Sequence, residues 1–87
     1  MSSVAHSADS GKRVPFARPK LLAAVVAGRV SPDTAAGLLD AQAILQRKGV
    51  EPTYYGVLAG VACGACSETA ADRWFAADWA VRTELSA

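Results

Sequence analysis

Alanine is the feature that most restricts how this chain can fold, because nineteen of its 87 residues are alanine. Alanine gives up no side-chain entropy when it enters a helix, so a chain this rich in alanine favours helix over strand. A chain of this length holds one domain at most, and a single small core leaves that domain marginally stable. The sequence therefore predicts an all-α fold, over half helical and without a sheet, that a partner or self-association stabilises.

Glycine stops and capped starts divide the chain into a small bundle of about four short helices. The clearest start is Ser31-Pro32-Asp33, where a capping hydroxyl, a proline suited to the first helical position and a first-turn acid follow one another. The expected helices span about 19–27, 32–48, 52–63 and 68–85. Residues 1–17 contain too little apolar surface to fold alone, so we expect a flexible basic tail before one helical domain at 18–87.

Charge is distributed unevenly along the chain. Residues 1–50 carry seven Lys/Arg against three Asp, a net +4, whereas residues 51–87 carry two Arg against five Asp/Glu, a net −3. This asymmetry suits head-to-tail docking, or a basic arm bound to an acidic partner. No secretory signal is visible, and the uncharged runs are shorter than the roughly 20 apolar residues that span a bilayer. We expect a cytoplasmic protein that does not contact membranes.

The last expected helix has a wide apolar face that contains one carboxylate. The stripe on a 100° wheel is flanked by Ala71 and Phe75 and consists of Ala70, Trp74, Ala77, Val81 and Leu85. Asp78 falls inside this face, four residues before Arg82, and the favoured interpretation is an i,i+4 ion pair at its rim. The alternative is that both residues contact a partner beside an exposed Trp79.

Three glycines recur every fourth residue in the third expected helix. Gly56, Gly60 and Gly64 would leave one side of that helix without side chains. Each interior glycine costs about 0.5–1 kcal/mol relative to alanine, so three of them suggest a close contact with another helix. Packing within the chain is the favoured interpretation, and a homodimer seam or a partner groove is the alternative.

Residues 21–39 read as a helix, a glycine stop, a capped restart and paired leucines: Leu-Leu-x-x-Val-x-x-Gly-x-Val-Ser-Pro-x-x-Ala-x-x-Leu-Leu. This segment resembles the short helical hairpins of bacterial oligomerisation modules. The resemblance implies a hairpin and an interaction role, and it covers these residues only.

Residues 44–60 resemble the helix-turn-helix of DNA-binding proteins. The turn glycine and the apolar packing positions of that motif correspond to Gly49, Val50, Tyr55 and Leu58. Leu45 replaces the usual small residue and Lys48 occupies a normally buried place. The would-be recognition helix has no Arg, Lys, Asn or Gln to pair with base edges. DNA binding is therefore an alternative hypothesis.

The two cysteines of the chain form a single CxxC motif, Cys63-Gly64-Ala65-Cys66, between the third and fourth expected helices. With Glu51 twelve residues before Cys63, the pattern resembles alkylhydroperoxidase D-like helical proteins, whose site reads Glu, eleven residues, CxxC, three residues, His. The resemblance implies thiol redox chemistry, but Ala70 stands where that family has its histidine.

Three roles are open for the thiols. Cys66 precedes the start of the last helix, where free N–H groups stabilise a thiolate, and Cys63 would be the poorer nucleophile. Zinc usually takes four ligands, so Cys63 and Cys66 could hold a metal only together with a second chain or a partner. The favoured interpretation is that both are buried structural thiols, with no metal bound.

Together these patterns favour a non-enzymatic interaction subunit, with an accessory, assembly or inhibitory role and no cofactor. The sequence offers no Ser/His/Asp set with an ordered histidine and no clustered carboxylates for acid–base chemistry. We expect the partner to be another protein or a second copy, with nucleic acid less favoured. The expected contact residues are Lys12, Arg13, Arg18, Lys20, Tyr54, Asp78, Trp79 and Arg82.

Overall fold

A computed structural model describes residues 16–87, which form four helices. These are α2 (Arg18–Val26), α3 (Pro32–Arg47), α4 (Tyr54–Ala62) and α5 (Glu68–Ser86). Of this part of the chain 74% is helical, and it contains no strand. The all-α prediction is confirmed.

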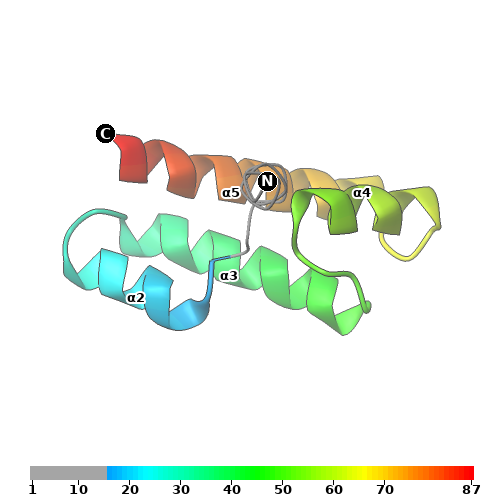
Figure 1. The fold of residues 1–87 in the computed structure, drawn as a ribbon, viewed down its shortest axis with the longest axis horizontal. Helices are drawn as coiled ribbons and strands as arrows, with labels where there is room; N and C mark the ends of the chain where they lie inside the picture. The colour runs from blue at the N-terminus through cyan, green and yellow to red at the C-terminus, as the bar shows by residue number, and fades with distance from the viewer. Residues whose placement is uncertain (1–15) are drawn as a thin grey trace, which may run out of the picture.

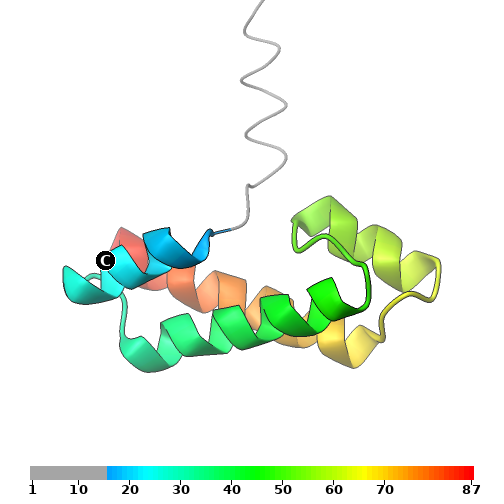
Figure 2. The same cartoon turned by 90° about the horizontal axis from the view of Figure 1, so that it is seen from below.

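The helices form two hairpins that pack through their longer arms. α3 and α5 lie side by side and run in opposite directions through the middle of the molecule (Figures 1 and 2). α2 packs against α3 at the end where α5 finishes, and α4 packs against α5 at the end where α5 begins. The hairpins therefore place their short helices, α2 and α4, at opposite ends of the molecule.

Helices α2, α3 and α4 end in the same hydrogen-bonded turn. After α3, the N–H of Gly49 donates to the Gln46 carbonyl and the N–H of Val50 donates to the Leu45 carbonyl. Gly49 has φ +75°, a left-handed conformation in which a side chain would be strained. Gly28 and Gly64 play the same part after α2 and α4.

Hydroxyl side chains begin the three later helices. The oxygens of Ser31, Thr53 and Ser67 each accept a hydrogen bond from the backbone N–H three residues on. The sequence prediction began the third helix at Pro52, two residues too early. Thr53 is in an extended conformation and caps the helix from outside it, so α4 begins at Tyr54.

The core lies between the two hairpins and is made of residues from all four helices and the three connections between them. Its largest fully buried side chains are Leu21, Leu38, Leu45, Val57 and Val81. Trp74 is also buried, and its ring meets that of Phe75 edge to face. No helix between residues 16 and 87 is long and apolar enough to cross a membrane.

Phe16 packs onto the folded domain, although the sequence prediction placed it in the tail. Its ring lies 4.8 Å from the guanidinium carbon of Arg82, and its carbonyl accepts a hydrogen bond from Gln42 Nε2 at 3.4 Å. A cation over an aromatic face is attracted by the ring quadrupole, which helps to hold the chain here before α2 begins. Lys12 and Arg13 lie outside the described residues, as does the rest of the expected tail up to residue 15.

Candidate functional site

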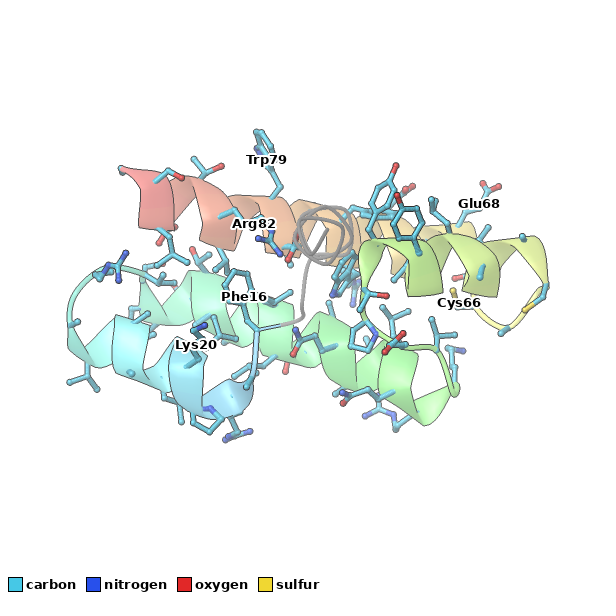
Figure 3. The ribbon with its side chains drawn as sticks, viewed as in Figure 1. Phe16, Lys20, Cys66, Glu68, Trp79 and Arg82 are labelled. Atoms are coloured by element: carbon cyan, nitrogen blue, oxygen red, sulfur yellow. The ribbon has the colours of Figure 1, made fainter. Side chains whose placement is uncertain are left out.

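An aromatic surface covers one side of the α4–α5 hairpin. We define this surface by Tyr54, Tyr55, Leu58, Phe75 and Trp79. All except Phe75 are classed as exposed, and Trp79 is the most open at 71%. Figure 3 shows the Trp79 side chain projecting from α5 away from α3. Exposed apolar side chains gathered on one face indicate a binding surface more strongly than scattered ones do.

Ring contacts join this surface to the core. The Tyr54 and Phe75 centroids are 5.7 Å apart, and those of Tyr54 and Tyr55 are 5.3 Å apart, both in edge-to-face geometry. Phe75 in turn contacts the buried Trp74 at 5.2 Å. Trp79 follows Phe75 by one helical turn, so the two lie on the same face of α5. The surface is therefore held on rigid helices and not on loops.

A shallow groove of about 280 Å³ runs between α4 and α5 beside the aromatic surface. Its apolar walls include Leu58 and Val61 from α4 and Phe75 from α5. Its charged residues are Glu68 and Asp72, which are both acidic. We call this the α4/α5 groove, and its negative charge selects against anionic ligands.

Two glycines let α4 pack closely against the segments before and after it. Gly60 is buried, and a Cβ there would lie 3.0 Å from both methyl carbons of Val50 and 3.2 Å from Cys66 Sγ. At Gly56 a Cβ would collide with the Glu51 carbonyl oxygen, which belongs to the segment just before α4.

The glycine prediction needs correction at Gly64. This residue lies beyond the end of α4 with φ +81°, and a Cβ there would meet nothing within 4 Å. Gly64 ends the helix and does not pack it. Gly56 makes its close contacts with the connection before α4, and Gly60 makes them with that connection and with the turn after α4. These contacts are not with another helix, although the sequence analysis expected one there.

Asp78 and Arg82 form an ion pair inside the fold instead of a surface contact. Arg82 Nε donates to Asp78 Oδ2 at 2.8 Å, and Asp78 is only 5% exposed. The favoured i,i+4 pairing is confirmed, but the Asp78 carboxylate is buried beneath Arg82 and does not lie at the rim of the apolar face. Arg82 also lies over the Phe16 ring, so the pair fastens the start of the folded domain to α5.

Arg18 and Lys20 are exposed on α2, at the other end of the molecule from α4. Figure 3 shows Lys20 far from Trp79. The structure therefore separates Arg18 and Lys20 from the predicted aromatic contact residues.

The two cysteines differ in exposure, although the sequence analysis favoured burial of both. Cys66 is buried at 6% exposure and packs near Gly60, whereas Cys63 is exposed at the end of α4. Cys63 Sγ contacts the Gly60 carbonyl at 3.6 Å. The turn directs Cys66 inward, so its place before α5 does not make it an accessible nucleophile. In residues 16–87 no three His, Cys, Asp or Glu side chains converge as metal ligands would.

The packing positions of the helix-turn-helix resemblance are only partly buried. Val50 is buried after Gly49, but Tyr55 and Leu58 are exposed. Helix α4 packs mainly against α5, whereas that motif packs its second helix against its first.

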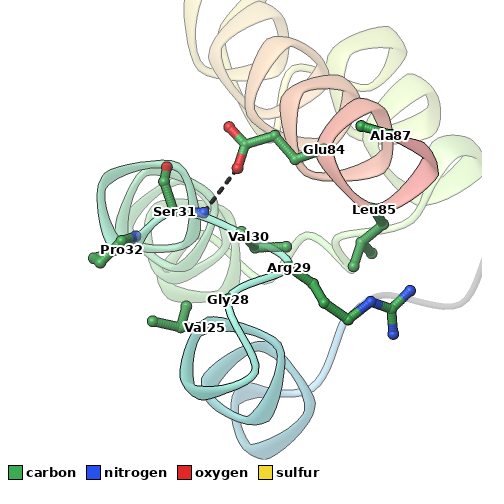
Figure 4. A pocket seen from close by; sticks show the side chains of 9 residues that line it. All are labelled: Val25, Gly28, Arg29, Val30, Ser31, Pro32, Glu84, Leu85 and Ala87. Atoms are coloured by element: carbon green, nitrogen blue, oxygen red, sulfur yellow. Dashed lines mark hydrogen bonds between the residues drawn. The ribbon is translucent and has the colours of Figure 1, made fainter.

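A carboxylate that the sequence analysis missed joins α5 to the start of α3. Glu84 Oε1 accepts from the Ser31 N–H at 2.7 Å and Oε2 accepts from the Thr34 hydroxyl at 2.6 Å. These hydrogen bonds, first from Thr34 and then from Ser31, lower the pKa of Glu84. The contact borders a groove of about 600 Å³ beside the Gly28–Pro32 turn (Figure 4). Free N–H groups at the capped start of α3 were the only sequence signal for such an acceptor.

Comparisons with known protein families, with curated proteins and with solved structures give no match for this chain.

Proposed function

We propose that this protein is a non-catalytic protein-binding subunit, with an accessory, assembly or inhibitory role, and that it binds through the aromatic surface. The observation that carries this proposal is the row of exposed rings and Leu58 on one side of the α4–α5 hairpin. Tryptophan and tyrosine dominate the energetics of protein interfaces because they bury a large rigid area at a low entropy cost.

The charge around the surface favours a protein partner over a nucleic acid. Glu68 and Asp72 border the adjoining groove, and a phosphate backbone would be repelled there. The partner that fits is a protein segment with apolar side chains flanked by Lys or Arg. Helix α4 presents tyrosines and Leu58 and contains no Arg, Lys, Asn or Gln. This composition suits contact with apolar side chains better than hydrogen bonding to the edges of bases.

Site-specific photo-crosslinking in the cells that make the protein tests this function. We would place the photoreactive analogue benzoylphenylalanine at Tyr55 and, as a matched control, at exposed Ala36 on α3. We expect protein adducts from position 55 that position 36 does not give. Adding Trp79→Ala should remove them, because that ring supplies a large share of the buried area.

Adducts that are equal at both positions, or that survive Trp79→Ala, would show that the aromatic surface is not a binding site. Adducts with nucleic acid would support the DNA-binding alternative in its place.

A further inference from the structure

A second exposed apolar face lies on α2, at the opposite end of the molecule from α4. Leu22 is 46% exposed and Val26 is 87% exposed, although both are large aliphatic residues. They lie one helical turn apart and therefore on one face of α2. Together with Tyr54, Tyr55, Leu58 and Trp79, they are the large hydrophobic residues that residues 16–87 leave exposed.

One arginine lies beside the aliphatic pair. Arg18 is exposed one helical turn before Leu22. We call Arg18, Leu22 and Val26 the α2 face. It has the composition that suits the α4/α5 groove, which is apolar side chains beside a cation.

Charge and length match between the two faces. The α4/α5 groove carries Glu68 and Asp72 and no Lys or Arg. Helix α2 has nine residues, as does α4, so each is about 13 Å long. A helix of this length can lie along α4 and bury Leu22 and Val26 against Leu58 and Phe75.

We propose that the α2 face of one copy docks into the α4/α5 groove of a second copy. This inference rests on the proposed function, because it names the occupant of the same surface. The two faces are different and lie at opposite ends of the molecule. The interface is therefore heterologous, with a different surface contributed by each copy. Repetition of such a contact produces head-to-tail oligomers, which grow as open chains or close into rings.

Two complementary variants of the full chain test the proposal. Val26→Glu blocks the α2 face, because its carboxylate would meet Glu68 and Asp72. Leu58→Glu blocks the groove by placing a charge on its apolar wall. We would measure molar mass by light scattering across a range of protein concentrations, with Ala36→Glu on α3 as the exposed control.

We expect the wild-type chain and Ala36→Glu to gain mass with concentration, and each blocking variant to keep the mass of a single chain. An equal mixture of the two blocking variants should form dimers and stop there, because each variant supplies the intact face that the other lacks. High salt should weaken the association by screening the Arg and carboxylate contacts. Unchanged far-UV circular dichroism shows that each variant is folded, and Val26→Ser replaces Val26→Glu if it is not.

Other outcomes overturn the proposal. A wild-type chain that stays monomeric at millimolar concentration excludes self-association, even if crosslinking at position 55 captures a different protein and so supports the proposed function. Association that Leu58→Glu abolishes and Val26→Glu leaves intact would show that two grooves face each other instead.

Discussion

At the scale of single residues, the Asp78–Arg82 pair is the most demanding contact in the fold. Asp78 is almost fully buried, and its second oxygen and the Trp74 indole N–H are buried without a hydrogen-bond partner among the described residues. A buried polar atom left without a partner costs about 1–3 kcal/mol. Arg82 is the group that makes burial of the carboxylate tolerable.

Replacing Arg82 should therefore destabilise the protein strongly. We expect Arg82→Met to lower the free energy of unfolding by about 1–3 kcal/mol, because it keeps the aliphatic stem but leaves Asp78 without its ion pair. Urea unfolding measures the loss. Arg73→Met, at an exposed position of the same helix, should change the value by no more than about 0.5 kcal/mol. Equal effects of the two changes would show that the pair is not stabilising.

The cysteines give a second prediction at this scale. Because Cys63 is exposed and Cys66 is buried, a thiol reagent should label Cys63 first in the folded protein. In Cys63→Ser the remaining thiol should react slowly until denaturant is added, and in Cys66→Ser it should react at once. Faster labelling of Cys66 in the native chain would restore the reactive role that its position before α5 suggested.

At the scale of helices, the Glu84 contact links the end of α5 to the start of α3. Its pKa is lowered in the folded protein by hydrogen bonds from Thr34 and Ser31. A carboxylate whose pKa falls on folding adds stability above its unfolded pKa, and that stability is lost as the pH falls through the folded pKa.

Glu84→Gln should therefore lower the free energy of unfolding at neutral pH. In acid, where the wild-type carboxylate is protonated, the difference in stability between the variant and the wild type should become smaller. Urea midpoints measured from neutral to acidic pH test this. The matched control is Asp40→Asn at an exposed position of α3, which should lower the urea midpoint at neutral pH by less than Glu84→Gln does. A constant difference between Glu84→Gln and the wild type at every pH would contradict the assigned cause.

Packing of α4 depends on Gly60. Because a Cβ there already falls within 3.0 Å of Val50, we expect Gly60→Leu to destabilise the protein by about 2 kcal/mol or more through overpacking. Gly37→Ala is the opposite control: nothing lies within 4 Å of its Cβ position in α3, so it should stabilise the protein by about 0.5–1 kcal/mol. Thermal melts of the wild type, Gly60→Leu and Gly37→Ala give the three midpoints. An unchanged midpoint in Gly60→Leu would show that α4 is not closely packed at this position.

At the scale of the whole molecule, the two hairpins share one core and should unfold together. Leu38 is fully buried in α3, so Leu38→Ala should lower the free energy of unfolding by about 2–5 kcal/mol. Since a small domain is stable by only about 5–15 kcal/mol, this change removes a large part of the total. Exposed Leu22→Ala, measured in dilute solution, should cost less than about 1 kcal/mol.

Cooperativity is tested in the same experiment. Helix content followed by circular dichroism and Trp74 fluorescence, read in a Trp79→Phe background, should be lost at the same denaturant concentration. Separate transitions would show that the hairpins are independent units.

The sequence by itself determined the four helices and most of their ends. Ser31, Ser67 and Gly28 act through hydrogen bonds to backbone groups within about five residues, so their effect can be read from a short stretch of sequence. The exposure of Trp79 and the pairing of Asp78 with Arg82 follow in the same way from helical spacing.

Only the tertiary structure decided what each face touches. The burial of Asp78 depends on how α5 is rotated against the helices around it, and the burial of Cys66 depends on the course of the turn after α4. The Glu84–Ser31 contact joins residues 53 positions apart. Local periodicity contains neither the rotation nor the partner of a helix. The role of Gly64 as a helix stop depends on the course of the turn after α4. The separation of the α2 face from α4 depends on how the two hairpins pack.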